Sequence, residues 1–206
     1  MKILLKYTIL LVLFTNCKAQ NDPQKTTKMK TFDIETFNKN KNRLNEYTFI
    51  SDDSTVTKQS DDVYEYYETV KSKESFFQSI NRYYKSGNIK LEGQIFQNFF
   101  QKGIWKEYDE KGNLIKETDY DAPYKFIWED ILKLIKNRKL DMDAYGFEVT
   151  RSFGFGTENI GKETEKPFWA ITYNKSEEDM LLGVIIIDGI TGKIIKEYEE
   201  PYASEE

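Results

Sequence analysis

The sequence predicts an α+β protein in which a series of antiparallel β-hairpins is followed by a helix packed on a small antiparallel sheet. Three observations lead to this prediction. Aromatic and β-branched segments alternate with polar or glycine-containing turns from residue 46 to residue 118. Residues 127–135 instead have the apolar spacing of an amphipathic helix. Further β-favouring segments at 147–153, 168–173 and 182–188 complete the chain.

The first 16 residues are typical of a secretory signal peptide. Lys2 and Lys6 lead into a short apolar run that ends just before Cys17. A helix that spans a bilayer needs about 20 apolar residues, so this run is too short to do so. A charged start, a short apolar core and small or polar residues before a cleavage site describe a signal for export.

Two cleavage sites compete at the end of this segment. Residues 13–17 resemble the lipobox of bacterial lipoproteins, although Phe14 and Asn16 differ from the residues usual at those places. The resemblance implies cleavage before Cys17 and a lipid on that residue. The alternative is an ordinary signal peptide cleaved after Ala19, which would leave a periplasmic or secreted protein.

The rest of the chain divides into three parts. Residues 17–31 are polar and lack apolar periodicity, which predicts a flexible tether. A β-rich region follows over residues 32–122. Pro123 ends the strand pattern, and an α+β domain is expected over residues 123–206.

The β-rich region is expected to open with a short helix near residues 32–37, where apolar residues recur at close spacing. Segments 47–50 and 55–57 flank the polar residues 51–54, which predicts a hairpin. Tyrosine and valine are frequent in residues 63–70, as in a strand.

Two later segments share one hairpin pattern. In each, an aromatic residue ends a strand, a Gly-Asn pair forms the turn and an apolar residue opens the return strand. Residues 84–92 and 108–117 align in this way if one extra turn residue is allowed. The pattern resembles the MORN-variant repeat family, a structural and interaction module with some antitoxin-like bacterial members. The residues that carry the resemblance are Tyr84, Gly87, Gly103, Trp105, Tyr108 and Gly112.

The helical segment and the strands after it resemble a PepSY-type domain. That family shows a Trp-x-hydrophobic strand and then a strand that ends in Asp-x-x-Thr-Gly, matched here by Trp169, Asp188, Thr191 and Gly192. The insert over residues 154–166 is longer than the short turn expected before the tryptophan strand. The resemblance implies a helix paired with an antiparallel sheet, in a domain that binds or restrains a partner.

Composition excludes much of enzyme chemistry. The chain has no histidine and a single cysteine, which removes Ser-His-Asp and Cys-His triads and nearly every transition-metal site. The spacing Asp141-x-Asp143 suggests a calcium loop, but Tyr145 stands at the fifth place, which needs an oxygen ligand, and Ser152 at the twelfth, which needs a bidentate glutamate. We therefore expect no catalytic residues, no metal site and no cofactor.

Charge bears on the class of partner. The chain has 30 basic and 35 acidic residues, well mixed, for a net charge of −5, which argues against nucleic-acid binding. We expect a non-catalytic, membrane-tethered binding protein of the bacterial cell envelope with a protein or peptide partner. The alternatives are an immunity or antitoxin protein that neutralises a toxin and, third, a carboxylate-based hydrolase.

Lipidation of Cys17 gives the first testable prediction. Replacement of Cys17 by Ser should abolish incorporation of a labelled fatty acid, because this residue is the only thiol in the chain. Metabolic labelling of the wild-type and Cys17→Ser proteins checks this. Equal labelling of the two proteins would leave only the unanchored, exported form.

Overall fold

The computed structural model describes residues 29–97, 99–152, 166–176, 178 and 180–202. They form a seven-stranded sheet in the order β1-β2-β3-β4-β5-β6-β7, a four-stranded sheet in the order β11-β10-β9-β8, and two helices. Every strand pair is antiparallel. The predicted series of antiparallel hairpins followed by a second small sheet is thus confirmed. Cys17 lies outside the described residues.

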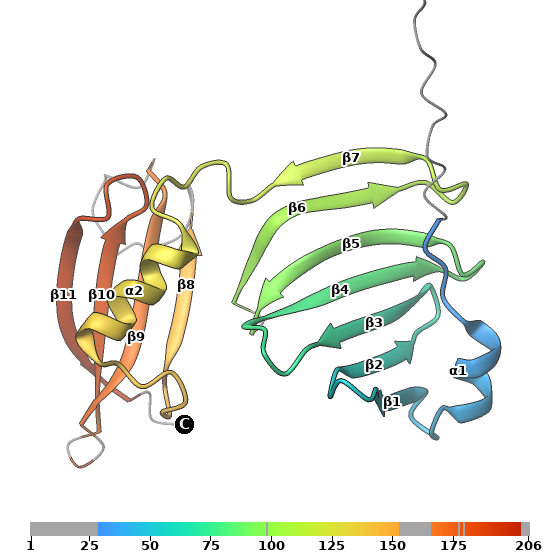
Figure 1. Ribbon diagram of the computed structural model, residues 1–206, viewed down its shortest axis with the longest axis horizontal. Coiled ribbons are helices and arrows are strands. Elements are labelled where there is room, and N and C mark those ends of the chain that lie inside the picture. Colours follow the sequence, from blue (N-terminus) through green and yellow to red (C-terminus); the bar gives the residue numbers. More distant parts are fainter. Residues whose placement is uncertain (1–28, 98, 153–165, 177, 179, 203–206) are drawn as a thin grey trace, which may run out of the picture.

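The elements follow the predicted order closely. The first part consists of α1 (Ile34–Asn40), β1 (Glu46–Ile50), β2 (Val56–Asp61), β3 (Glu65–Lys71), β4 (Phe77–Tyr84), β5 (Ile89–Phe96), β6 (Phe100–Tyr108) and β7 (Leu114–Asp119). The second part consists of α2 (Trp128–Arg138), β8 (Glu148–Ser152), β9 (Phe168–Ser176), β10 (Leu181–Asp188) and β11 (Ile194–Pro201). Figure 1 shows α1 beside one end of the seven-stranded sheet and the four-stranded sheet beyond the other end.

The two glycine turns of the hairpin pattern have the same geometry. The N–H of Gly87 donates to the carbonyl of Tyr84 at 2.8 Å, and the N–H of Gly112 donates to that of Asp109 at 2.9 Å. Both glycines have positive φ, +90° and +84°, which side chains other than glycine rarely adopt. The turn itself was therefore predicted correctly from the glycine and the asparagine that follows it.

The alignment of the two hairpins differs from the expected one. Tyr84 accepts the turn hydrogen bond from Gly87 as Asp109 accepts that from Gly112, so Tyr84 and Asp109 are equivalent. The two turns therefore align without an extra residue, and Tyr83 is the equivalent of Tyr108. Tyr83 and Tyr108 contribute to one hydrophobic cluster on the same face of the sheet. Tyr84 follows Tyr83 in β4 and lies on the opposite face, since successive side chains of a strand alternate.

The N-terminal segment packs on one face of the seven-stranded sheet, which we call the inner face. Asp33 caps α1 by accepting the N–H of Thr36 at 2.9 Å. Phe32 stacks on Tyr66 at 4.5 Å between ring centroids, and Phe37 is completely buried beside them. Tyr66 and Tyr83 mark the inner face, and the opposite side is the outer face.

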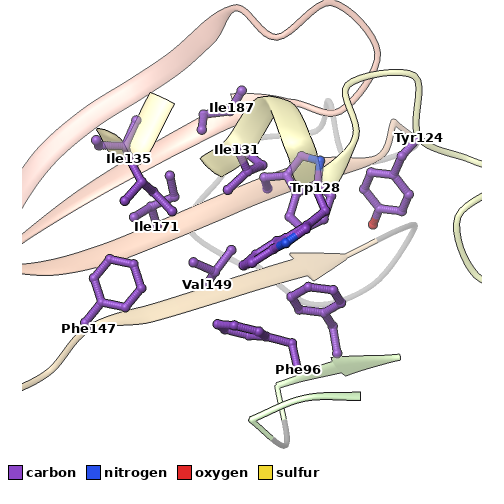
Figure 2. Packing of buried hydrophobic residues seen from close by; sticks show 12 residues of the cluster. Phe96, Tyr124, Trp128, Ile131, Ile135, Phe147, Val149, Ile171 and Ile187 are labelled. Atoms are coloured by element: carbon purple, nitrogen blue, oxygen red, sulfur yellow. The ribbon is translucent and has the colours of Figure 1, made fainter. Parts of the chain in front are cut away.

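The four-stranded sheet packs against the second helix. α2 lies on the four-stranded sheet, and its residues Ile131 and Ile135 are buried in one cluster with Val149, Ile171 and Ile187 (Figure 2). The helix ends at Lys139, which is left-handed with φ 55°. None of the helices in the described ranges is long and apolar enough to cross a membrane.

The two sheets share this core. Phe96 and Phe100, at the turn between β5 and β6, belong to the cluster that α2 builds with the four-stranded sheet. Phe96 lies 4.7 Å from Trp128, and Phe100 meets Trp169 edge-on at 5.3 Å. The Arg151 guanidinium lies over the rings of Phe100 and Trp169, at 4.8 and 5.3 Å. The ends of β5 and β6 are therefore fastened into the second sheet.

This shared core predicts a difference between two neighbouring phenylalanines. Phe96→Ala should lower the free energy of unfolding by about 3–5 kcal/mol, because it empties a fully buried site. Phe99, 37% exposed in the same turn, is the matched control, and Phe99→Ala should cost less than about 1 kcal/mol. Urea unfolding followed by tryptophan emission measures both. A cost for Phe96→Ala no larger than that of the control would contradict the shared core.

Candidate functional site

A row of polar side chains crosses the inner face between its two apolar clusters. Strand register places these residues side by side from β2 to β7, each directly opposite the next. We call this set the polar row. Its members, in order, are Gln59, Glu68, Asn81, Glu92, Lys106 and Glu117. Apolar side chains usually fill a sheet face between two hydrophobic clusters, so a row of polar residues is informative there.

Glu68 is the centre of the first half of the row. Its carboxylate accepts hydrogen bonds from Gln59 at 2.8 Å, from Asn81 at 3.0 Å and from the Tyr83 hydroxyl at 2.9 Å. Asn81 is only 2% exposed, and its carbonyl oxygen accepts from the ammonium of Lys30 at 2.8 Å. These buried polar groups are hydrogen-bonded to one another, so the network holds each side chain in a defined position.

The second half of the row repeats part of this arrangement. The Tyr108 hydroxyl donates to Glu92 at 2.7 Å, as Tyr83 does to Glu68. Burial, together with the hydrogen bond and charge of Glu92, raises the pKa of Tyr108 to about 12. Burial and the charge of Glu68 raise the pKa of Tyr83 in the same way. Both phenols therefore remain protonated donors at neutral pH.

A cavity of about 200 Å³ lies over the middle of the row, and we call it the groove. It is lined by Lys30, Ser79, Asn81, Glu92, Gly93, Gln94, Ile104 and Lys106. Lys106 pairs with Glu117 at 3.6 Å, and the side chains of both remain partly exposed. The groove thus offers ammonium and amide donors beside carboxylate and amide acceptors, which suits hydrogen bonding to a polar ligand.

The N-terminal segment is held beside the groove by the glycine turns. A Cβ on Gly87 would lie 3.3 Å from the Ile34 side chain, and one on Gly112 would collide with Met29. The N–H of Phe32 donates to the carbonyl of Gly87 at 2.8 Å, which brings Lys30 to the groove. The repeat glycines Gly87 and Gly112 therefore position the site without lining it.

The other residues of the repeat pattern are divided between the two faces. Tyr108 reaches the polar row on the inner face, whereas Tyr84 lies on the outer face and donates its hydroxyl to the Tyr108 carbonyl at 2.8 Å. Trp105 also lies on the outer face, over Gly93. Gly103 has a positive φ of +66° next to the register shift between β5 and β6.

The predicted residues of the second domain serve the fold. Trp169 is completely buried and donates its indole N–H to the carbonyl of Phe126 at 2.8 Å. Asp188 accepts the N–H groups of Thr191 and Ile190 at the turn between β10 and β11, and these bonds lower its pKa. Gly192 ends that turn with φ +71°. None of these residues lines the groove.

The polar row was missed by the sequence analysis. Gln59, Glu68, Asn81 and Glu92 each stand within two residues of other polar residues in the sequence, so each resembles an ordinary solvent-facing position. The available signal was the recurrence of Tyr and Glu around both glycine turns. Within the described ranges, no group of three or more acidic or cysteine side chains is placed to hold a metal ion.

The network predicts unequal effects for two glutamates of the row. Glu68→Ala should lower the free energy of unfolding by about 1–3 kcal/mol or more, because Gln59, Asn81 and Tyr83 lose their acceptor. Glu117→Ala removes a partly exposed ion pair with Lys106 and should cost less than about 1 kcal/mol. Urea unfolding of both variants checks this. Equal costs would show that the row is not a cooperative network.

No protein-family model, curated protein or solved structure matches the chain.

Proposed function

We propose that this chain is a non-catalytic binding protein, tethered to a membrane of the bacterial cell envelope through a lipid on Cys17, and that the groove receives a protein or peptide partner. The polar row is the observation that carries this proposal. Polar groups that lose contact with water lower stability unless they are hydrogen-bonded. A sheet that served only as a scaffold would gain more from apolar residues at these positions.

An extended polypeptide suits the row best. Neighbouring strands lie about 4.8 Å apart, so a segment that crosses the strands over the groove meets Ser79 on β4, the acceptor Glu92 on β5 and the donor Lys106 on β6. Such a segment carries N–H and C=O groups at intervals of a few ångströms along its backbone. The mixed donors and acceptors of the groove can pair with both kinds of group.

Binding also fits the chemistry of the groove better than catalysis. The chain has no histidine, and the carboxylates of Glu68 and Glu92 each accept a hydrogen bond from a tyrosine. This arrangement holds them as acceptors and does not present one acid and one base to a common reacting atom. The hydrolase alternative is therefore the weaker one.

The proposal extends to the organisation of the chain. We assign residues 32–122 to a MORN-variant-like repeat region and residues 123–206 to an α+β, PepSY-like domain, after a signal peptide and a tether. Residues 17–31 would then lead from the lipid to the folded part, which the last of them already contact, since Lys30 reaches the polar row through Asn81. The immunity alternative differs only in the identity of the partner, which would be a toxin.

Two lysines provide a matched test of this function. Lys106 and Lys116 both join β6 to β7 through ion pairs, with Glu117 at 3.6 Å and Glu107 at 2.9 Å. Lys106 lines the groove on the inner face, whereas Lys116 lies on the outer face. The two variants therefore remove the same kind of interaction from opposite faces of one strand pair.

Affinity capture from membranes should recover a stoichiometric partner with the wild-type chain. Lys106→Ala should lower the affinity for the recovered partner about tenfold, which corresponds to about 1.4 kcal/mol, and Lys116→Ala should leave it unchanged. Affinity is measured with the purified partner. If the wild-type chain recovers no partner, or both lysine variants weaken binding equally, the groove is not the binding site.

A further inference from the structure

No helix or second sheet of the described ranges packs on the outer face of the seven-stranded sheet. Among the described residues, α1 and the core of the second sheet both contact the inner face. One residue of the outer face, Trp105, has no part in the proposed function. Trp105, half-buried on β6, lies there between Gly93 of β5 and Thr118 of β7.

The indole of Trp105 lies flat on the sheet. A Cβ built on Gly93 would lie within 2.6 Å of three ring atoms, Cγ, Cδ2 and Cε2. A point this close to three atoms of the five-membered ring must lie above the face of the ring and not beside its edge. The ring is therefore parallel to the sheet, and the absence of a side chain on Gly93 leaves room for it. The indole N–H donates to the carbonyl of Gln94 at 3.2 Å, which fixes the ring's orientation.

Tyr120 stands upright beside this flat ring. The two ring centroids are 5.9 Å apart, and the planes meet at 71°. A Cβ on Gly103, two residues before Trp105, would meet no atom within 4 Å, so the space there is open. Trp105 and Tyr120 thus present one flat and one upright ring side by side on the outer face, and we call this pair of rings the seat.

The seat suits an uncharged ligand. Thr118, directly opposite Trp105, is neutral, and the flanking Glu107 and Lys116 neutralise each other in an ion pair of 2.9 Å. The ligand must therefore bind through an apolar surface and neutral hydrogen bonds. A charged ligand would find the flanking charges, Glu107 and Lys116, already paired with each other, so the loss of its hydration would be poorly compensated.

We propose that Trp105 and Tyr120 bind a sugar ring of a neutral glycan. The apolar C–H face of a pyranose matches a flat indole in size, and its weakly positive hydrogens face the negative π-surface. Hydroxyl groups at the rim of the sugar would meet the hydroxyls of Thr118 and Tyr120. Proline-rich peptides bind in grooves lined by aromatic rings, whereas here a single flat ring meets an upright one.

Tryptophan emission reports on this seat selectively. Trp128 and Trp169 are 5% and 0% exposed, so quenching by acrylamide acts mainly on Trp105. Titration of the full chain with chitohexaose and cellohexaose should protect this emission from the quencher. Calorimetry on the same solutions gives the affinity for each oligosaccharide, and a proline decapeptide is titrated in parallel.

Four variants separate the seat from the rest of the molecule. Trp105→Ala should abolish oligosaccharide binding, and Gly93→Ala should weaken it at least tenfold, because the new methyl group forces the retained indole off the sheet. Tyr64→Ala, which removes an 80% exposed tyrosine elsewhere, should bind as the wild type does. Lys106→Ala should also bind normally, which distinguishes this site from the groove.

Three results would overturn the glycan site. The first is that neither oligosaccharide protects the emission or gives heat. The second is that Trp105→Ala or Gly93→Ala, with an unchanged urea midpoint, binds as tightly as the wild-type chain. The third is protection by the proline decapeptide alone, which would assign the seat to a peptide.

Discussion

Insertion of the β5–β6 turn into the core of the second sheet is the contact on which the rest of the structure depends. Phe96 and Phe100 pack against Trp128 and Trp169, which belong to α2 and β9. Aromatic side chains bury about 150–250 Å² each, and well-oriented pairs add about 0.5–1.5 kcal/mol beyond that burial. The contact therefore joins the two sheets firmly at one end of the strands.

This contact also defines the groove. α1 and the Phe32 cluster cover the inner face at one end of the strands, and the aromatic core covers it at the other. The polar row lies in the interval between them. Because Lys30 reaches the row from the N-terminal segment and lines the groove, the groove requires that segment to be in place.

The pleat of β6 separates two different surfaces. Trp105 and Lys106 are neighbours in sequence, yet one lies flat on the outer face and the other lines the groove on the inner face. Successive side chains of a strand point to opposite sides, so a single hairpin presents the polar groove on one face and the flat indole on the other. Among the described residues, the cover of the inner face lies at the two ends of the strands.

Local chemistry in the sequence determined the elements themselves. The Gly-Asn turns required positive φ at Gly87 and Gly112, the apolar spacing around Ile131 required a helix, and the absence of histidine limited the chemistry. These features depend on residues a few positions apart, so they can be predicted without knowledge of the fold.

Only the tertiary structure decided which residues meet across strands. The alignment of Glu68 with Asn81 and Glu92 depends on strand register, and register shifts occur between β4 and β5 and between β5 and β6. Such irregularities change the partner of every residue beyond them. The alignment of Tyr84 with Tyr108 was an error of another kind, because Tyr83 and Tyr108 each stand four residues before the turn glycine and align without a gap. The flat indole over Gly93 and the shared aromatic core likewise join separate segments, so they follow from packing alone.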